Sequence, residues 1–160
     1  MRIRSFLQHD LTRLTELTIE TFGPFYEDSF RPLVGEVVFT NQHGQWRDDY
    51  VKQVAELHDP AQHRYVAVAE IDSVIAGYVA WAGDPERRNA SVTILAVSAK
   101  HRRLGAGTVL CEHAFAAMRE LGAEVVTIGT GGDGFHAPAR ALYEALGCTP
   151  LPVAVYYREL

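Results

Sequence analysis

The 160-residue sequence predicts an α/β fold in which one mixed β-sheet carries helices on both faces. This prediction rests on the order of the predicted elements, βααβββαβαβ, and on the hydrophobic periodicity of each element. No linker or repeat divides the chain, so we expect a single domain over residues 1–160. A domain of this length buries about two-thirds of the surface that its unfolded chain exposes.

The N-terminal part is predicted to be a short strand followed by two amphipathic helices. Asp10 is a typical N-cap residue, and Leu14 and Leu17 recur on one face of the helix that it would start. Gly23 and Pro24 are expected to end that helix. The aromatic segment that follows has no clean period. The predicted elements are a strand over 2–7, a helix over 10–22, an irregular or partly helical segment over 24–44 and a helix over 46–57.

The rest of the chain is predicted to alternate strands, turns and helices. Asp72-Ser73 separates two apolar runs as a hairpin turn, although it lacks the stronger Asn-Gly signal. Gly122 and Gly147 are expected to end two helices, and Pro138 fits the first turn of the second. The predicted elements are strands over 65–71, 75–82 and 90–97, a loop over 84–89, a helix over 104–121, a strand over 124–129, a helix over 138–146 and a last strand over 153–158.

Composition and charge exclude several classes of protein. With 48% hydrophobic and 22% charged residues, the chain has the composition of a soluble globular protein. It shows neither a membrane-spanning stretch nor the apolar core of a signal peptide, so we expect a cytoplasmic protein with no membrane partner. The net charge of −5 argues against nonspecific binding of nucleic acid and permits a cationic substrate.

The cysteines and histidines do not indicate a disulfide or a metal. Cys111 and Cys148 form neither a disulfide framework nor a metal-binding pattern, so we expect two buried free thiols. The seven histidines lack a paired ligand spacing such as HExxH, so no metal is expected. Exposed strand edges would allow a homodimer, which no other feature of the sequence indicates.

The most informative segment joins the strand predicted over 90–97 to the helix that follows it. Arg102, Arg103, Gly105 and Gly107 place two basic side chains and two glycines at the start of this helix. The first N–H groups of a helix have no internal partner, and the helix dipole places partial positive charge there. Glycine lets an anion approach these amides without a Cβ in the way. The sequence therefore predicts a site for a phosphorylated cofactor.

The element order and two motifs resemble the GNAT superfamily of N-acetyltransferases, which transfer an acetyl group from acetyl-CoA to an amine. Arg102, Gly105 and Gly107 match the family's Arg/Gln-x-x-Gly-x-Gly/Ala loop. The segment 136–148 resembles the family's Asn-x-x-Ala-x-x-Leu-Tyr-x-x-x-Gly-Phe motif. The resemblance covers residues 62–150 well and the preceding residues only in outline. It implies the GNAT fold, with acetyl-CoA bound between splayed central strands.

The resemblance also implies which residues hold acetyl-CoA. The backbone amides of the loop would bind the pyrophosphate, and the end of the preceding strand would pair with the pantetheine arm. His136 replaces the Asn that helps to fix this arm, and an imidazole can both donate and accept a hydrogen bond there. Ala99 and Arg103 replace a usual Pro and Gly without removing a required amide. The implied cofactor-binding residues are Leu95, Ala96, Val97, Arg102, Arg103, Leu104, Gly105, Ala106, Gly107, Thr108, His136 and Ala139.

Tyr143 occupies the position of the family's general-acid tyrosine and is implied to be the catalytic residue. Its phenol would donate a hydrogen bond or a proton to the departing CoA thiolate. The alternative is a tyrosine that only packs its ring on the helix face. No carboxylate lies within 89–99, the strand on which many relatives carry the general base. Glu36, Glu70 and Asp72 are candidates for this base, and a water that relays the proton to bulk solvent is an equal alternative.

A second glycine-rich segment, Gly129–Gly134, contains the pattern G-x-G-x-x-G between a strand and a helix. A dinucleotide-binding fold would require a further βαβ unit and an acidic residue about 20 positions on, and neither follows here. We therefore interpret the segment as a flexible connection beside the cofactor arm or the substrate cleft. A nucleotide-binding oxidoreductase remains a minor alternative.

Aromatic and acidic residues of the N-terminal half are candidates for an acceptor pocket. In relatives this region varies with the substrate, and an acidic, aromatic pocket suits a primary amine. Aromatic residues at helical spacing are, however, more often core residues. The candidates are Phe25, Tyr26, Glu27, Asp28, Phe30 and Trp46, with Tyr156 and Tyr157 as a second wall.

The predicted function is direct transfer of the acetyl group to an amine-bearing small molecule or to a protein acceptor. No covalent enzyme intermediate is expected, because neither cysteine lies where the family does its chemistry. A non-catalytic GNAT-fold module that binds acyl-CoA or regulates another protein is the alternative. The sequence does not identify the acceptor.

Overall fold

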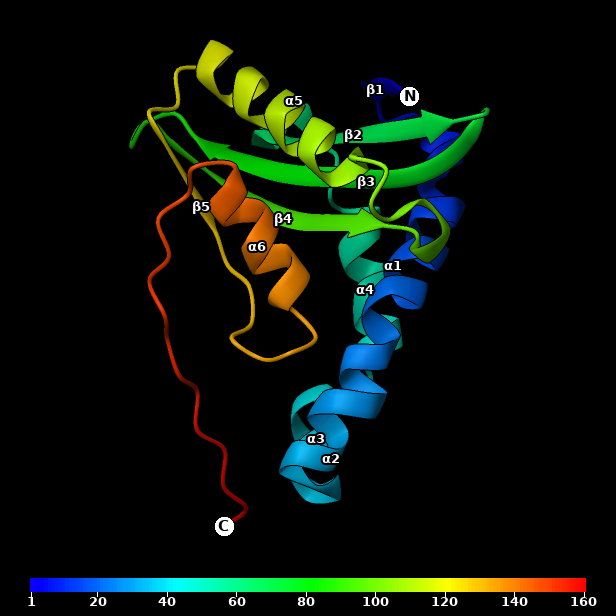
Figure 1. Cartoon of the computed structure of the whole chain (residues 1–160), viewed down its shortest axis with the longest axis vertical. Coiled ribbons are helices and arrows are strands. Elements are labelled where there is room, and N and C mark those ends of the chain that lie inside the picture. The colour runs from blue at the N-terminus through cyan, green and yellow to red at the C-terminus, as the bar shows by residue number, and fades with distance from the viewer.

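The computed structural model describes residues 1–160, and its centre is a five-stranded sheet in the order β1-β2-β3-β4-β5 (Figure 1). Neighbouring strands are antiparallel, except that β4 and β5 run parallel. This is the mixed sheet that the sequence predicts. The strands are β1 (Arg2–Ser5), β2 (Arg64–Ile71), β3 (Val74–Asp84), β4 (Asn89–Val97) and β5 (Val125–Ile128).

Helices cover both faces of this sheet, as predicted (Figure 1). On one face lie α1 (Leu11–Pro24) and α4 (Trp46–Ala55), and on the other lies α5 (Ala106–Glu120). The short helices α2 (Arg31–Val34) and α3 (Glu36–His43) extend the α1 side away from the sheet, and α6 (Ala137–Ala145) packs beside α5. None of these helices combines the length and the apolar character needed to cross a membrane.

Each face of the sheet has its own hydrophobic core, because successive strand residues point to opposite faces. Along β4, Ile94 and Ala96 face α1, whereas Leu95 and Val97 face α5. The core under α1 includes Leu14, Leu17, Val68, Tyr78 and Ile94, and the core under α5 includes Val79, Trp81, Val92, Leu110 and Met118.

The predicted turn between β2 and β3 is confirmed. Asp72 and Ser73 both have positive φ, 51° and 63°, as the two central residues of a type I′ turn require. Gly122 and Gly147, with φ of 90° and 84°, end α5 and α6 in the left-handed conformation that was expected of them.

The N-terminal helices continue further than the sequence predicts. α1 runs through Gly23 and Pro24, and the π-helical segment Phe25–Phe30 follows without a break. Pro24 has no N–H to donate, and the helix changes to the wider π turn directly after it. Gly23 has a packing role instead, because a Cβ there would lie 2.9 Å from Cη2 of Trp46. The segment 24–44 is therefore mostly helical.

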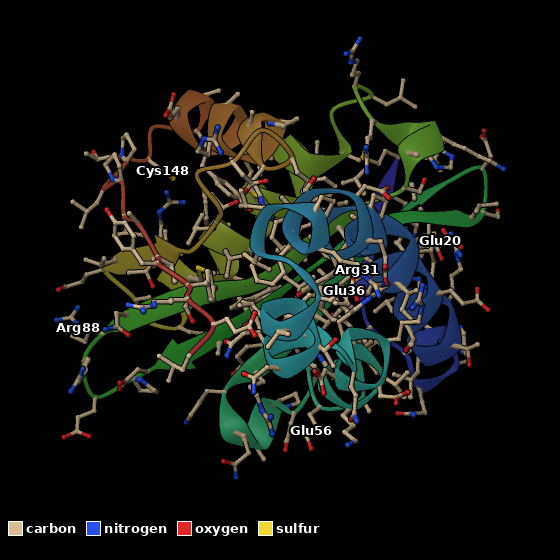
Figure 2. The ribbon with its side chains drawn as sticks, turned by 90° about the horizontal axis from the view of Figure 1, so that it is seen from below. Glu20, Arg31, Glu36, Glu56, Arg88 and Cys148 are labelled. Carbon is tan, nitrogen blue, oxygen red and sulfur yellow. The ribbon has the colours of Figure 1, made fainter.

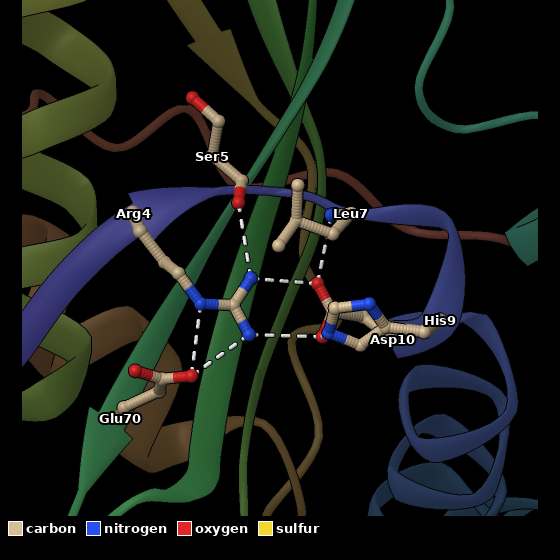
Figure 3. Close-up of polar contacts among 6 residues, drawn as sticks. All are labelled: Arg4, Ser5, Leu7, His9, Asp10 and Glu70. Atoms are coloured by element: carbon tan, nitrogen blue, oxygen red, sulfur yellow. Dashed lines mark hydrogen bonds and ion pairs between the residues drawn. The ribbon is translucent and has the colours of Figure 1, made fainter.

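Asp10 occupies the N-cap position of α1, as predicted, but its side chain makes no capping bond to the helix. It ends a short 3-10 turn, and its carboxylate accepts the N–H of Leu7 at 2.8 Å. The same carboxylate accepts two bonds from the Arg4 guanidinium, at 2.7 and 2.9 Å, and Arg4 also donates to Glu70 of β2 at 2.8 Å (Figure 3). Because Asp10 is only 2% exposed, this network fixes the start of α1 against β1 and β2 in the interior.

The last predicted strand, over 153–158, is not formed. The final ten residues run as an extended coil past α6, away from the sheet (Figure 1). Val153, Val155 and Tyr156 are 75%, 70% and 92% exposed. The β-branched and aromatic residues of this segment are typical of a strand, but a strand needs a hydrogen-bonded neighbour, and the sheet ends at β5.

Candidate functional site

Strand β4 is paired on both sides only along its first half. On the β5 side, the ladder ends where Val92 lies opposite Ile128. On the β3 side, pairing continues as far as Val97, which lies opposite Gly77. The backbone of Leu95–Val97 therefore has a free edge that faces away from β3. An extended ligand can bind such an edge through main-chain hydrogen bonds.

A β-bulge marks the point where β4 and β5 separate. Ile94 pairs with Ala80 and Val92 pairs with Trp81, so Thr93 has no counterpart on β3. Thr93 is exposed although both of its neighbours in β4 are buried. A bulge bends its strand, and such bends occur often next to functional sites.

β4 leads through a short loop into the start of α5. Gly105 precedes the helix with a left-handed φ of 79°, and the first helical bond runs from the N–H of Val109 to the carbonyl of Gly105 at 3.1 Å. The N–H groups of Ala106, Gly107 and Thr108 lie before this bond and have no i−4 partner within the helix. A Cβ on Gly105 would meet no atom within 4 Å. The helix start is thus open, and it lies two residues later than predicted.

Two basic side chains stand in the loop before these amides. Arg102 and Arg103 are both exposed, and Arg103 has a positive φ of 64°. Below them, the Ser98 hydroxyl and Nδ1 of His101 form a hydrogen bond of 2.6 Å that holds the loop. Positive charge at a helix N-terminus opposes the helix dipole, so a bound anion would relieve this repulsion. The geometry suits a phosphate group.

α6 lies close to the start of α5. A Cβ on Gly107 would lie 3.1 Å from Cδ2 of Leu142 and 4.0 Å from Cγ2 of Val97. The second glycine of the loop therefore allows α6 to approach α5 and β4, in addition to leaving the amides uncovered. The motif alone does not reveal this packing role.

Tyr143 is half-buried on α6, near both cysteines. Burial, together with the neighbouring thiols of Cys111 and Cys148, raises the pKa of Tyr143 to about 12. The phenol is therefore protonated at neutral pH. Both thiols are free, as expected, but only Cys111 is fully buried; Cys148 is partly accessible at the end of α6.

The glycine-rich segment 129–134 folds as a loop that side chains hold in place. Arg140 of α6 donates to the carbonyl oxygens of Gly131 and Asp133, at 2.6 and 2.7 Å. His136, at the N-cap of α6, shares a 2.6 Å hydrogen bond between its Nδ1 and the Asp133 carboxylate. No strand follows α6, so the βαβ unit of a dinucleotide-binding fold is absent.

Comparison with known proteins identifies the family to which this arrangement belongs. The family model described as Acetyltransferase (GNAT) family matches residues 13–148. The chain belongs to the GNAT acetyltransferase family. The phosphinothricin N-acetyltransferase of Streptomyces viridochromogenes is 36% identical to this GNAT chain over an alignment of 112 residues, and the alignment covers 66% of this chain and 54% of the relative. The chain thus spans about half the length of that relative.

Solved structures share the GNAT fold over nearly the whole chain. The aminoglycoside 6'-N-acetyltransferase AAC(6')-IG from Acinetobacter haemolyticus matches with a TM-score of 0.67 and 15% identity, covering 100% of this chain and 99% of that one. AAC(6')-Iy, in complex with the bisubstrate analog CoA-S-monomethyl-acetylneamine, matches with a TM-score of 0.69 and 15% identity, covering 99% and 97%. Identities this low establish a common fold.

In this GNAT chain, several predicted acceptor residues belong to the helical support instead. Trp46 is 3% exposed, stacks on Tyr26 with ring centroids 5.1 Å apart, and donates its indole N–H to Glu27 at 3.0 Å. Glu27 also accepts a 2.7 Å bond from Arg31. These contacts hold the π-helical segment against α4, so Trp46 is a core residue and the Glu27 carboxylate is already paired.

Two other predicted acceptor residues contact the C-terminal part of the chain. The Phe25 ring lies 4.8 Å from the His136 ring and 5.6 Å from the Phe135 ring, measured between centroids. Phe30 meets Tyr157 of the C-terminal coil at 5.3 Å. Tyr156, in contrast, is 92% exposed and makes no such ring contact. Phe25 thus brings the acceptor side of the protein into contact with the start of α6.

The three carboxylates considered as bases lie elsewhere. Glu36 is paired with Arg31 at 2.7 Å, and the two side chains lie beside each other on the helical side of the molecule (Figure 2). Glu70 is paired with Arg4 in the network at the start of α1. Asp72 lies in the turn between β2 and β3. The sequence analysis missed Asp133 and Arg140, for which the only signal is the spacing Asp-x-x-His before a helix.

Proposed function

We propose that this chain is an N-acetyltransferase that moves the acetyl group of acetyl-CoA directly to an amine. The observation that carries the proposal is the free edge of β4 at Leu95–Val97, which continues into the unpaired amides at the start of α5. An extended arm that ends in a pyrophosphate matches both parts of this surface. Two relatives are named for acetyl transfer to the amines of phosphinothricin and of aminoglycosides, which supports an amine acceptor.

The residues that would hold acetyl-CoA follow from this surface. The backbone of Leu95, Ala96 and Val97 would pair with the pantetheine arm. The N–H groups at the helix start would bind the pyrophosphate, and Arg102 and Arg103 would add charge-assisted bonds. Leu104 is 57% exposed beside this site and would cover the ligand. The full set of proposed contacts also includes Gly105, Ala106, Gly107, Thr108, His136 and Ala139.

Bound acetyl-CoA supplies an activated thioester, and the chain supplies position and protons. Tyr143 is the proposed general acid, since a phenol with a pKa of about 12 carries its proton until a thiolate develops beside it. The aromatic surface around Phe25 would contact the acceptor, which is an amine-bearing small molecule or a protein amine. We expect no covalent enzyme intermediate.

The test begins with binding and ends with turnover. Acetyl-CoA at a hundredfold excess over its dissociation constant should stabilise the protein by about 2.7 kcal/mol in a thermal-shift titration, whereas NAD and ATP should not. Release of free CoA thiol is then measured with phosphinothricin, neamine and a lysine peptide as acceptors. No shift at millimolar acetyl-CoA would refute the cofactor, and binding without turnover would favour the non-catalytic module.

Tyr143→Phe separates the general acid from the binding site. This variant should keep its affinity for CoA within about twofold and lose about 10²-fold or more in kcat. Tyr65→Phe is the matched control, because Tyr65 stacks on Trp81 in the core beneath α5 and is not among the proposed contacts. Equal activity of Tyr143→Phe and Tyr65→Phe would show that Tyr143 only packs its ring.

A further inference from the structure

The acetyl transfer needs a group that takes a proton from the acceptor, and the candidate carboxylates are paired or distant. An amine that is protonated in water has no lone pair, so a base must act before it can attack. The search for this base leads to His136 at the start of α6. Its Nδ1 shares a 2.6 Å bond with Oδ1 of Asp133, and its Nε2 makes no hydrogen bond within the protein.

The hydrogen bond to Asp133 defines the state of the imidazole. Partial burial would raise the pKa of the Asp133 carboxyl, but the hydrogen bond and charge of His136 lower it below its ordinary value. Asp133 is therefore a carboxylate acceptor, and Nδ1 of His136 carries the hydrogen. In the neutral imidazole, Nε2 then has the free lone pair.

Several contacts prevent the ring from turning away. Phe25 and Phe135 contact it edge to face, with centroids 4.8 and 5.0 Å away. A Cβ on Gly131 would collide with both the Asp133 carboxylate and Nδ1 of His136, so only glycine fits beside the pair. The Asp133 carboxylate also accepts the N–H of Phe135 at 3.1 Å. The pair is thus oriented by its surroundings, as a proton-transfer group must be.

His136 lies at the start of α6, the helix that carries the proposed general acid. His136 and Tyr143 are seven positions apart, which places them on one face of α6, about 10 Å apart along its axis. The Phe25 contact ties His136 to the acceptor side of the molecule. The loop that carries the pair begins directly after Ile128, where β5 parts from β4. Acid and base would therefore flank the free edge of β4.

We propose that His136 is the general base of the transfer and that Asp133 is its positioning residue; this inference rests on the proposed function. Nε2 removes one proton from the acceptor ammonium, and the amine nitrogen forms a bond to the thioester carbon. The carbon–sulfur bond breaks, and the thiolate takes a proton from Tyr143. The amide nitrogen loses its second proton to reprotonate Tyr143, and His136 releases its proton to solvent. The reaction thus yields an amide, CoA thiol and one proton.

Asp133 stabilises the positive charge that the ring acquires in this step. The charged groups beside the ring are Asp133 and the Arg140 guanidinium, which is held by the carbonyls of Gly131 and Asp133. The π-helical segment packed against the ring contributes the uncharged Phe25. A single carboxylate therefore faces the imidazole, through Nδ1.

The experiment compares four variants with the wild type, using acetyl-CoA with phosphinothricin, neamine and a lysine peptide as acceptors. His136→Asn supplies the residue usual in the family, so it should keep CoA affinity within about twofold while kcat falls about 10²-fold or more. His136→Ala should show the same loss, and added imidazole should restore part of its turnover in a saturable manner. Asp133→Asn should lower kcat less than either His136 variant does. His113 is an exposed histidine on α5, so His113→Gln should match the wild type in kcat.

The pH profile gives a second readout that a structural role would not change. The wild-type kcat should fall on the acid side as the base becomes protonated, and His136→Asn should lose that limb of the profile. Turnover by His136→Asn at the wild-type rate would overturn the inference and leave the proposed function standing. Weaker CoA binding at unchanged kcat would also overturn it, because His136 would then act only as a cofactor contact and not as the base. A wild type that binds acetyl-CoA but acetylates no acceptor would overturn both proposals.

Discussion

The network of Arg4, Asp10 and Glu70 allows the free energy of one substitution to be worked out from the structure. Asp10→Asn removes the charge of a carboxylate that is 2% exposed and that accepts three hydrogen bonds (Figure 3). Breaking a buried ion pair costs about 3–5 kcal/mol. Asparagine keeps one carbonyl oxygen, and Glu70 keeps Arg4 partly paired. We therefore expect the free energy of unfolding to fall by about 3 kcal/mol, at the lower end of this range. In a chain of this length, this lowers Tm by about 6–12 °C.

The same carboxylate predicts how stability depends on pH. The hydrogen bond from Arg4 lowers the pKa of Asp10, despite the opposing effect of burial. A group whose pKa is lower in the folded state contributes stability above its unfolded pKa, about 3.9, and loses it as pH falls through its folded pKa. The difference in the free energy of unfolding between wild type and Asp10→Asn should therefore be constant from pH 7 to about pH 5 and should shrink below about pH 4.

Urea unfolding at several pH values measures both effects. Glu20→Gln is the matched control, because it breaks an ion pair with Arg13 in which the Glu20 side chain is 59% exposed. An exposed pair contributes about 0–1 kcal/mol, so this variant should stay close to the wild type. A loss for Asp10→Asn no larger than that for Glu20→Gln would refute the reasoning. A difference in unfolding free energy between wild type and Asp10→Asn that stayed unchanged down to pH 3 would also refute it.

Three further predictions concern single positions. Tyr78→Phe removes a buried 2.6 Å bond to the Thr18 hydroxyl, which still bonds the Leu14 carbonyl, so the free energy of unfolding should fall by about 1 kcal/mol in urea titrations. Gly105→Ala and Gly122→Ala should each lower the free energy of unfolding by about 1–2 kcal/mol, because alanine disfavours the left-handed φ of both positions. Only Gly105→Ala should weaken CoA binding measured by calorimetry. Gly131→Ala should lower kcat far more than it lowers Tm, since its Cβ displaces His136.

The parts of the fold that depend on local sequence could be predicted. The β2–β3 turn and the glycines that end α5 and α6 follow from backbone conformations that few residues adopt. Each of these features is decided by neighbours in the sequence, and the structure keeps them with shifts of one or two residues. That the cofactor binds at the loop before α5 stays a prediction.

The errors arose where distant contacts override a local signal. Gly23 and Pro24 form a typical helix stop, yet α1 continues because Gly23 makes room for Trp46 and the π-helical turn tolerates the proline. The segment 153–158 has the β-branched and aromatic residues of a strand, yet no strand lies beside it. In both cases the deciding partner is far away in the sequence or absent.

The continuity of α1 has a consequence for the chemistry of the site. A helix that stopped at Gly23 would leave Phe25 in a loop, whereas the unbroken helix carries Phe25 to the His136 ring, 111 positions later in the chain. The start of the same helix is fixed by the buried Asp10 carboxylate. The helix that anchors the N-terminal end of the fold therefore also forms one wall around the proposed base. Because no local pattern encodes a contact of this range, the sequence could suggest His136 as a cofactor ligand but not as a base.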